Sequence, residues 1–384
     1  MAKPDFIELP GCEPRPNRKT NLTWQLSANR RNMACIVMAK EFRIQHLQLV
    51  GIITKALADI GVPAPICAIE AEVMAEADLL GVPSHGVRML PGLIKGIRAG
   101  RVAANPKIKI IRERPATCVL DGDNGPGRFV SVQAMQHAVE RAQRSGIGAC
   151  LATRTTHWGR AHAYACRAAQ AGMIGVCTTN AIPNMLAWGS SRPLLGNNPL
   201  AVGVPHGRGR EPIVLDMAMS QAAVGKIGTF LREGKKVPAN WGQDAAGRPS
   251  DNPAAILAGK KILPFGEHKG VGLALMMELI TGALSGGLFS HEIGRADSTG
   301  LDIGSSKLFL ALDVSAVVDP AKFHQRVQDL IDWLRQAEPG LTITLPGERG
   351  WQTRRRYLAE GIPIHAEIAA QLETIGVRLE EALA

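Results

Sequence analysis

The chain has 384 residues, of which 46% are hydrophobic and 4% aromatic, and its formal net charge is +10. This length suffices for one large domain or two to three smaller ones, each with a buried core. The basic residues are dispersed and not interleaved with aromatic ones, so the charge favours anionic small molecules over nucleic acid as partners.

The chain has no sign of a membrane or secreted protein. No uninterrupted apolar run reaches the ~18 residues that a membrane-spanning helix needs. The first 37 residues lack the apolar segment of a secretory signal. The seven cysteines form no C-x-x-C pair, which indicates ordinary thiols in a reducing compartment. We therefore expect a cytoplasmic protein that binds neither membrane nor nucleic acid and has no metal site.

The first part of the chain is irregular. Residues 1–37 show no periodic pattern, and four prolines interrupt any helix there. A helical pattern begins only after Met38, with apolar residues at helical spacing from Phe42 to Leu57. We interpret residues 1–37 as a loosely held N-terminal arm, with Met38 as an alternative natural start.

The rest of the chain changes from helices to an alternation of strands and helices. Further helices are expected at 65–80, 84–100, 130–144, 160–171, from 217, 266–286 (buried), 319–336, 353–360 and 365–380, and strands at 107–112, 118–120, 147–152, 173–179, 200–204, 212–215 and 307–313. This order predicts an α/β domain over 116–334, with a polar excursion at 232–262. A mostly helical domain is expected from both chain ends, 38–115 and 335–384.

The turn around His85 is the first candidate for chemistry. Ser84 and His85 follow Pro83 and precede Gly86, between two predicted helices, so their backbone is constrained. An imidazole can give or take a proton near neutral pH. A helix cap or a surface histidine is the alternative interpretation.

The common phosphate-binding signatures are missing. The glycine clusters at 122–127 and 270–272 both fail the G-x-G-x-x-G spacing, and no G-x-x-x-x-G-K-[ST] motif occurs. A dinucleotide bound by this chain would therefore not use the usual Rossmann fingerprint.

Other candidates lie where predicted strands end. His157 lies between a strand and a helix, where α/β proteins bind ligands. Asp216 ends a strand, where an acid can orient an imidazole or simply cap a helix. His268 and Lys269 open the predicted buried helix, where an anion would be stabilised. For each of these residues a purely structural role is the alternative.

Six collinear motifs together resemble the malate/L-lactate dehydrogenase family that is distinct from the Rossmann enzymes. They are Ser84–Val87, His157–Gly159, Gly196–Pro199, Asp216–Ser220 with Gly225–Lys226, His268–Gly270 and Leu345–Arg349. The resemblance runs from about Met38 to the C-terminus. The last two motifs, together with Pro264–Gly266, favour the Δ1-piperideine-2-carboxylate reductase branch.

The resemblance implies a homodimer with an α/β, L-sulfolactate dehydrogenase-like, non-Rossmann fold. It implies hydride transfer between NAD or NADP and a small 2-oxo acid, 2-hydroxy acid or cyclic 2-imino acid. His85 would be the proton donor, with Ser84 and Asp216 as its relay partners. The chemistry agrees, because reducing C=O or C=N also needs a proton on the heteroatom, and a positioned histidine that supplies it contributes about 10²–10⁴ in rate.

The resemblance also implies the binding residues. Substrate contacts would be His157 and Pro183, with Arg88, the neighbour of Met89, as a further candidate because it could replace a carboxylate-binding arginine. Cofactor contacts would be His157, Trp158, Gly159, Arg160, Ala161, Thr179, Asn180, His206, Gly207, Arg208, His268, Lys269, Gly347, Glu348 and Arg349. Arg208 and Arg210 follow a predicted strand and would suit the 2′-phosphate of NADP, although a solvated basic loop is the alternative. We therefore expect NADP in preference to NAD.

Three positions depart from the family pattern. Met89 stands where the family usually has an arginine expected to bind the substrate carboxylate, Leu93 where it often has a tyrosine, and Asn197 where it usually has a threonine. Methionine cannot replace that arginine. The alternative function is therefore a dinucleotide-binding protein with lost or altered catalysis.

Overall fold

The computed structural model describes residues 42–207, 209–296, 302–338 and 340–379. The chain divides into a unit of residues 1–39 and a unit of residues 40–384, and every described residue belongs to the second unit. The predicted arm 1–37 and Arg208 lie outside the described residues.

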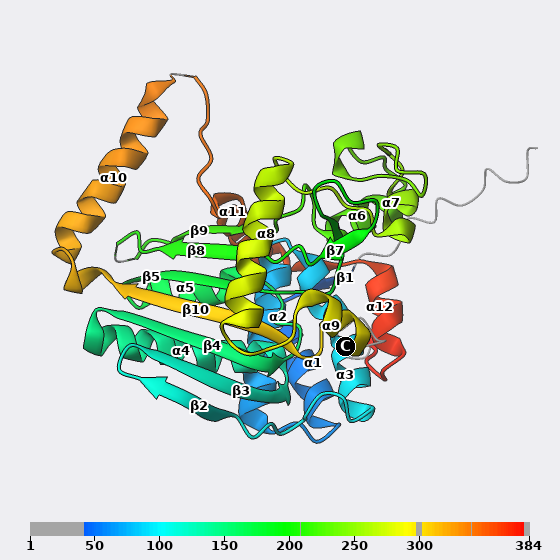
Figure 1. The fold of residues 1–384 in the computed structure, drawn as a ribbon, viewed down its shortest axis with the longest axis horizontal. Helices are drawn as coiled ribbons and strands as arrows, with labels where there is room; N and C mark the ends of the chain where they lie inside the picture. Colours follow the sequence, from blue (N-terminus) through cyan, green and yellow to red (C-terminus); the bar gives the residue numbers. More distant parts are fainter. Residues whose placement is uncertain (1–41, 208, 297–301, 339, 380–384) are drawn as a thin grey trace, which may run out of the picture. The chain divides into compact units, whose positions relative to one another are not determined.

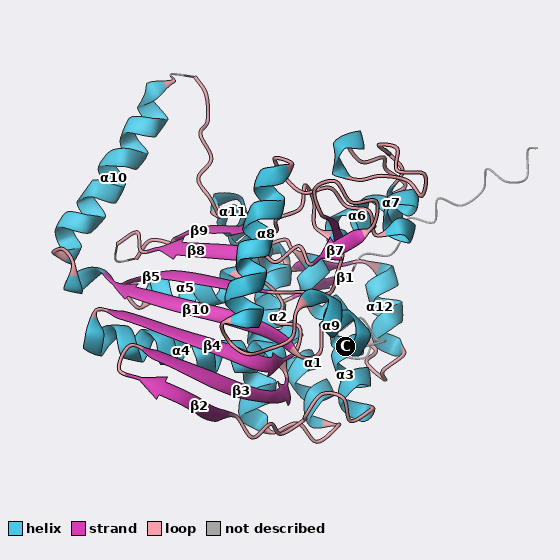
Figure 2. Ribbon diagram, in the orientation of Figure 1, coloured by secondary structure: helices cyan, strands magenta, loops and turns pink. Residues whose placement is uncertain are grey.

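A seven-stranded mixed sheet forms the centre of the unit (Figures 1 and 2). Its order is β2 (Lys109–Arg114), β3 (Thr117–Gly125), β4 (Ile147–Thr155), β10 (Ser305–Asp313), β5 (Met173–Thr179), β8 (Leu200–Val204) and β9 (Ile213–Met217). Strands β3 and β4 pair in parallel, whereas the other neighbours are antiparallel. This arrangement differs from the parallel sheet of a Rossmann domain, as the missing glycine fingerprint led us to expect.

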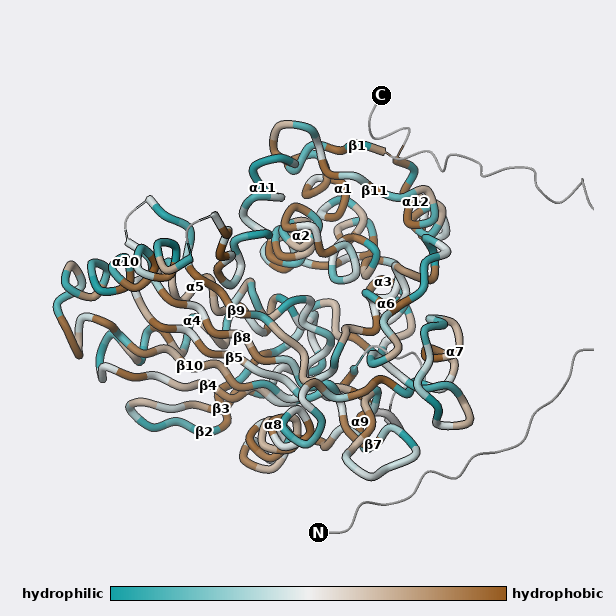
Figure 3. The backbone as a smooth tube through the Cα atoms, turned by 90° about the horizontal axis from the view of Figure 1, so that it is seen from above, coloured by the Kyte–Doolittle hydropathy of each residue, from teal (hydrophilic) through white to brown (hydrophobic). Residues whose placement is uncertain are grey.

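Helices α4 (Gly127–Ser145) and α5 (His162–Gln170) cover one face of the sheet, and α8 (His268–Glu278) lies on the other side (Figure 3). The close approach of α4 depends on small residues. A Cβ on Gly148 of β4 would lie 2.0 Å from the carbonyl oxygen of Ala138 in α4. A side chain at this position would therefore push α4 away from the sheet.

A second core joins the two ends of the described chain. It contains β1 (Phe42–Ile44), α1 (His46–Ala58), α2 (Ala64–Leu79), α3 (Leu90–Arg98), β11 (Ile362–Ile364) and α12 (Ala366–Glu373). Strands β1 and β11 pair antiparallel, Phe42 opposite Ile364. The buried residues of this core come from 44–102 and 362–379, together with Ile303.

The remaining elements surround these two cores. They are η1 (Pro83–His85), η2 (Val87–Met89), β6 (Met185–Leu186), β7 (Pro193–Leu195), α6 (Val224–Arg232), η3 (Ala239–Trp241), α7 (Pro253–Gly259), the π turn η4 (Leu279–Ala283), α9 (Ser290–Ala296), η5 (Val314–Ala316), α10 (Pro320–Ala337) and α11 (Glu348–Glu360). Within the excursion 232–262, Val237, Ile256 and Ile262 pack with Ile227 of α6 into a small core of their own. None of the helices in the described ranges is both long and apolar enough to cross a membrane.

Three of the predicted elements are wrong. Phe42–Ile44 forms strand β1 and not the start of a helix, because it pairs with a strand some 320 residues later. No helix begins at Met217, because this residue ends β9 opposite Leu200, and α6 starts only at Val224. The helix predicted as buried within 266–286 exposes Leu273, Leu275, Met276 and Leu279, each at 40–45%.

Candidate active site

The turn that carries Ser84 and His85 is anchored on α2. Asp78, near the end of that helix, accepts a hydrogen bond from the backbone N–H of Val87 through Oδ2 (2.7 Å). A Cβ on Gly86 would lie only 2.1 Å from the Asp78 carboxyl group. Glycine at 86 is therefore required for the turn to approach α2.

Ser84 and His85 are joined by a hydrogen bond. Ser84 Oγ lies 2.9 Å from His85 Nδ1. Gly225 of α6 faces Ser84 so closely that a Cβ there would be 2.4 Å from Ser84 Cβ. The motifs around His85 and Gly225 are thus in contact. The hydrogen bond with Ser84 engages Nδ1 of the imidazole and leaves Nε2 without this partner.

His157 lies beside His85. The two rings are stacked, with centroids 5.9 Å apart and planes 26° apart. His157 Nδ1 accepts a hydrogen bond from the backbone N–H of Gly159 (3.1 Å). The neutral ring therefore carries its proton on Nε2 and can donate a hydrogen bond from that atom.

Both imidazoles are neutral at pH 7 in the free chain. Burial lowers the pKa of His85 to about 4; the nearby Asp216 carboxylate raises this pKa, but by less than burial lowers it. Burial, together with His85, Arg128 and Lys307, lowers the pKa of His157 well below its usual value. The sequence predicted an imidazole that titrates near neutral pH, and desolvation in this packed region is the reason for the difference.

Asp216 binds Arg160. Its Oδ2 accepts a hydrogen bond from Arg160 Nε (2.8 Å) and one from the backbone N–H of His162 (3.4 Å). Among the described contacts none joins Asp216 directly to His85. The carboxylate therefore acts on His85 through space, and not as a hydrogen-bonded relay partner.

Sequence reasoning missed three buried charged residues of this region. Arg128, at the start of α4, forms an ion pair with Glu70 of α2 through Nη1 (3.1 Å). Lys307 of β10 donates hydrogen bonds to the Thr156 carbonyl (3.0 Å), Ser305 Oγ (2.9 Å) and Thr155 Oγ1. These hydrogen bonds fix the two residues that precede His157. Glu70 is one of four acidic residues in α2, so nothing in the sequence singled it out, and nothing singled out Arg128 or Lys307.

Some predicted cofactor residues gather at the start of α5. Gly159, Arg160 and Ala161 precede this helix, and Gly347, Glu348 and Arg349 begin α11. The segment before α11 reaches the sheet, because the Pro346 carbonyl accepts a hydrogen bond from the backbone N–H of Val214 in β9 (3.2 Å). Trp351 of α11 packs on His162 of α5, with ring centroids 5.2 Å apart.

Other predicted cofactor residues have structural roles or lie elsewhere. Trp158 is buried against Tyr164 and Phe309. The side chains of Thr179 and Asn180 hydrogen-bond to the backbone around Ser306. His206 and Gly207 follow β8 at the end opposite Asp216, with His206 Nε2 3.3 Å from Gln328 of α10, whereas His268 and Lys269 are exposed at the start of α8.

The predicted substrate residues are likewise dispersed. Pro183 is half-buried in the loop between β5 and β6. Arg88 is half-buried. Burial is the main cause that lowers its pKa; the nearby Arg232 cation lowers it further, and the Glu367 carboxylate raises it. Of the three, only His157 is in contact with His85.

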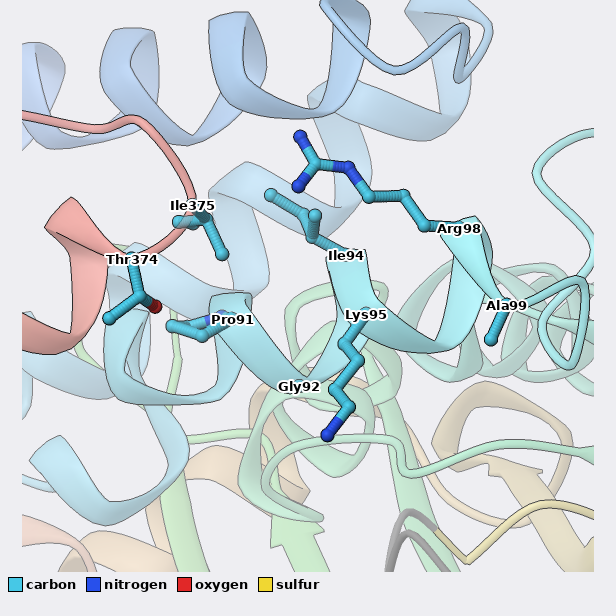
Figure 4. Close-up of a pocket in the computed structure, with 8 residues that line it drawn as sticks. All are labelled: Pro91, Gly92, Ile94, Lys95, Arg98, Ala99, Thr374 and Ile375. Atoms are coloured by element: carbon cyan, nitrogen blue, oxygen red, sulfur yellow. The ribbon is translucent and has the colours of Figure 1, made fainter.

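Two cavities lie on either side of η2 and α3. A groove of about 530 Å³ lies between α3 and the end of α12, with Lys95 and Arg98 extending away from each other (Figure 4). It contains none of the predicted site residues. A smaller cavity, of about 20 Å³, is lined by Met89, Leu93, Val102, Arg128, Thr156 and His157 and has room for about one water molecule. This second cavity adjoins the paired histidines and is the candidate for the inner end of a substrate site.

Comparisons with known proteins agree on one family. A family model described as malate/L-lactate dehydrogenase matches residues 44–373. Malate dehydrogenase of Pyrococcus horikoshii is 33% identical over 347 residues, which cover 88% of this chain and 95% of that protein. The sulfolactate dehydrogenase structure from Methanocaldococcus jannaschii has a TM-score of 0.81 at 32% identity, covering 89% and 100%. Δ1-Piperideine-2-carboxylate reductase from Pseudomonas syringae has a TM-score of 0.79 at 28% identity, covering 87% and 99%.

The Asp78 anchor predicts a pH-dependent stability. Burial raises the pKa of Asp78 to about 7 from an ordinary value of 3.8, so the folded chain holds this proton where the unfolded chain has lost it. The contribution of Asp78 to stability should therefore be complete below about pH 4 and decline as the pH rises to about 7, by up to about 1.4 kcal/mol per pH unit.

The measurement is the free energy of unfolding of wild type and Asp78→Asn by urea titration at pH 5, 6, 7 and 8. The amide keeps an acceptor for Val87 but has no proton to lose. The free energy of unfolding of wild type should fall relative to that of the variant up to about pH 7, and above this pH the difference between them should stay constant. A difference that stays constant across these pH values would show that Asp78 does not titrate there.

Proposed function

The chain belongs to the malate/L-lactate dehydrogenase family of oxidoreductases, and on this basis we propose that it transfers a hydride between NAD(P) and carbon 2 of a small 2-oxo or 2-hydroxy acid, or of a cyclic 2-imino acid. The observation that carries the proposal is the placement of His85, with Ser84 on its Nδ1 and His157 beside its ring. Relatives named as malate and sulfolactate dehydrogenases and as a piperideine-2-carboxylate reductase support both substrate branches.

The start of α5 fits a dinucleotide. Arg160 Nη1 and His162 Nδ1 are buried there without a hydrogen-bond partner. Buried polar atoms of this kind are rare unless a ligand or water satisfies them. Arg160 and the backbone of Gly159 and Ala161 would hold an anionic part of the cofactor, with Gly347–Arg349 on the other side. When bound, the nicotinamide supplies or accepts the hydride.

His85 handles the proton. Ser84 engages Nδ1, which leaves Nε2 for the oxygen or nitrogen on carbon 2 of the substrate. In the oxidative direction the neutral imidazole accepts the proton of the hydroxyl group. In the reductive direction a substrate carboxylate within about 4–6 Å raises the pKa of His85 and favours its charged, donating form. Asp216 adds to this effect through space.

The alternative function is cofactor binding without the family's chemistry. Met89 and Leu93 favour it, because neither can bind a carboxylate as the usual residues of the family are expected to do. Turnover of a 2-oxo acid or a cyclic imine by wild type separates the two functions.

We further propose that the protein is a homodimer that uses NADP in preference to NAD. The exposed apolar residues on α8 and η4 support the dimer, since a contiguous patch of this kind on an isolated chain is typical of an interface. For the cofactor, Arg210 lies beside Gln328 in the loop after β8 and supplies one of the two arginines for a 2′-phosphate.

The first prediction concerns activity. Oxidation of NADPH and NADH at 340 nm should be supported by at least one member of a panel of 2-oxo acids and cyclic imines. His85→Ala should lower kcat about 10²–10⁴-fold, because it removes the proton donor. His291→Ala, an exposed histidine outside the site, is the matched control. Cofactor binding without turnover by wild type would favour the alternative function.

The second prediction concerns the cofactor. Replacing both Arg208 and Arg210 by alanine should raise KM for NADPH far more than KM for NADH, because only NADPH carries the 2′-phosphate. Steady-state kinetics with each cofactor at saturating substrate give both values. Equal changes in the two KM values would contradict the proposed site.

The third prediction concerns assembly. Light scattering should give wild type twice the mass of one chain, and Leu275→Glu together with Met276→Glu should give the mass of a single chain, because both side chains lie on the exposed face of α8. Leu341→Glu, at an exposed position outside α8, is the control. A dimer that survives the α8 substitutions would place the interface elsewhere.

A further inference from the structure

The small cavity beside His85 and His157 has one cationic side and one apolar side. Arg128, Thr156 and His157 form the polar side. Met89, Leu93 and Val102 form the other side. Position 89, where the family usually has an arginine, is an apolar methionine in this chain. The same cavity nevertheless contains an arginine, Arg128 of α4.

Arg128 is fixed with part of its guanidinium unused. The residue is 2% exposed. Its Nη1 binds Glu70 (3.1 Å), and its Nη2 reaches the carbonyl oxygen of His85 by a long hydrogen bond (3.4 Å). Its Nε is buried and has no hydrogen-bond partner. The edge formed by Nε and Nη2 is one of the two edges of a guanidinium that can bind a carboxylate with two parallel hydrogen bonds.

The missing side chain of Gly159 leaves room for a ligand atom beside this buried edge of Arg128. A Cβ on Gly159 would lie 2.9 Å from Arg128 Nε and 3.5 Å from Nη2, and Gly159 has a positive φ of +77° that also disfavours a side chain. The same residue fixes His157 through its N–H. Glycine at this position thus serves both the guanidinium and the imidazole.

Arg128 is already paired with one carboxylate, and its Nε remains as a donor for a second acceptor. Glu70 is its one carboxylate partner among the described contacts, and that carboxylate also accepts the backbone N–H of Phe129 (2.9 Å). His85 and His157 are neutral, so neither offsets the charge of an incoming ligand. Arg128 Nη2 lies 3.4 Å from the carbonyl oxygen of His85, and Arg128 lines the same cavity as His157, so its charge lies close to both imidazoles.

We propose that Arg128 binds the substrate carboxylate through Nε and Nη2 in place of the arginine missing at position 89, and that Met89, Leu93 and Val102 enclose an apolar side chain of the substrate. The preferred substrate is then a 2-oxo or cyclic 2-imino acid without a second acidic group. Arg128 already contacts the backbone of His85, so a carboxylate there places carbon 2 next to the two imidazoles. This inference rests on the proposed function.

The test compares an acid with its amide. Wild type should reduce pyruvate with a kcat/KM about 10- to 100-fold above that for pyruvamide, which has the same shape but no charge. It should also prefer pyruvate to oxaloacetate, whose second carboxylate would meet the apolar side of the cavity. In Arg128→Gln combined with Glu70→Gln, which leaves no unpaired buried charge, the preference for the acid should fall to within a few-fold.

Matched variants separate binding from structure. Glu70→Gln alone keeps Arg128 and should keep the preference for the acid, although its melting temperature should fall because the buried guanidinium loses its carboxylate partner. Adding Met89→Arg to the double variant should restore that preference, which a merely structural role of Arg128 would not produce. The melting temperature and NADPH affinity of each variant verify folding. Turnover by the double variant with an unchanged preference for pyruvate over pyruvamide would overturn the proposal and leave the proposed function intact.

A binding measurement covers the case in which wild type reduces none of these compounds. Calorimetry with oxamate, an unreactive carboxylate analogue of a 2-oxo acid, at saturating NADH needs no turnover. An oxamate Kd that is about 10- to 100-fold higher in the double variant than in Glu70→Gln would support Arg128 while the proposed reaction fails. Equal Kd values, or no oxamate binding by wild type, would overturn the assignment of Arg128.

Discussion

The buried ion pair between Glu70 and Arg128 is the constraint on which the site depends. Glu70 accepts hydrogen bonds from the Arg128 side chain and from the backbone N–H of Phe129, so α2 holds the first turn of α4 in place. Removing one partner of such a pair costs about 3–5 kcal/mol, because the other charge remains buried without compensation. Two helical turns later the same α2 holds the His85 turn through Asp78. One helix therefore sets the distance between His85 and the Arg128 cation beside it.

This helix lies between the two cores, which explains how the site is assembled. Most buried residues of α2 belong to the core built from both chain ends, whereas Val73 belongs to the core around the sheet. We propose that these cores correspond to the helical domain and the α/β domain expected from the sequence. The turn that carries His85 then comes from the first domain and His157 from the second, so the geometry of the two imidazoles depends on how the domains are packed.

The sequence was informative where local patterns decide the structure. Strands β5 and β8 have the predicted bounds, and α2 begins and ends within one residue or so of its proline and glycine signals. It failed where the deciding partner is distant. Phe42–Ile44 resembles a helix start until its pairing with Ile362–Ile364 is known, and α8 has a buried pattern although its apolar face is exposed in a single chain.

The same limit applies to the site. The motifs around His85, Gly225 and His157 could be identified in sequence, and they do meet in space. Arg128 could not be identified, because an arginine at the start of an amphipathic helix is usually solvated, and its partner Glu70 lies 58 residues away. Asp216 was identified as an acid near the site, but its partner Arg160 depends on how β9 packs on α5.

The two edges of the sheet are protected by different means, with a consequence for how this chain misfolds. An open edge strand can pair with another chain and begin aggregation. At β2 four of six residues are charged and all are exposed, which opposes such pairing. At β9 the backbone N–H of Val214 donates a hydrogen bond to the carbonyl oxygen of Pro346, so this segment of the same chain covers part of the edge. If 346–351 detaches during partial unfolding, β9 loses this cover. Self-association under mild heating should therefore start at β9.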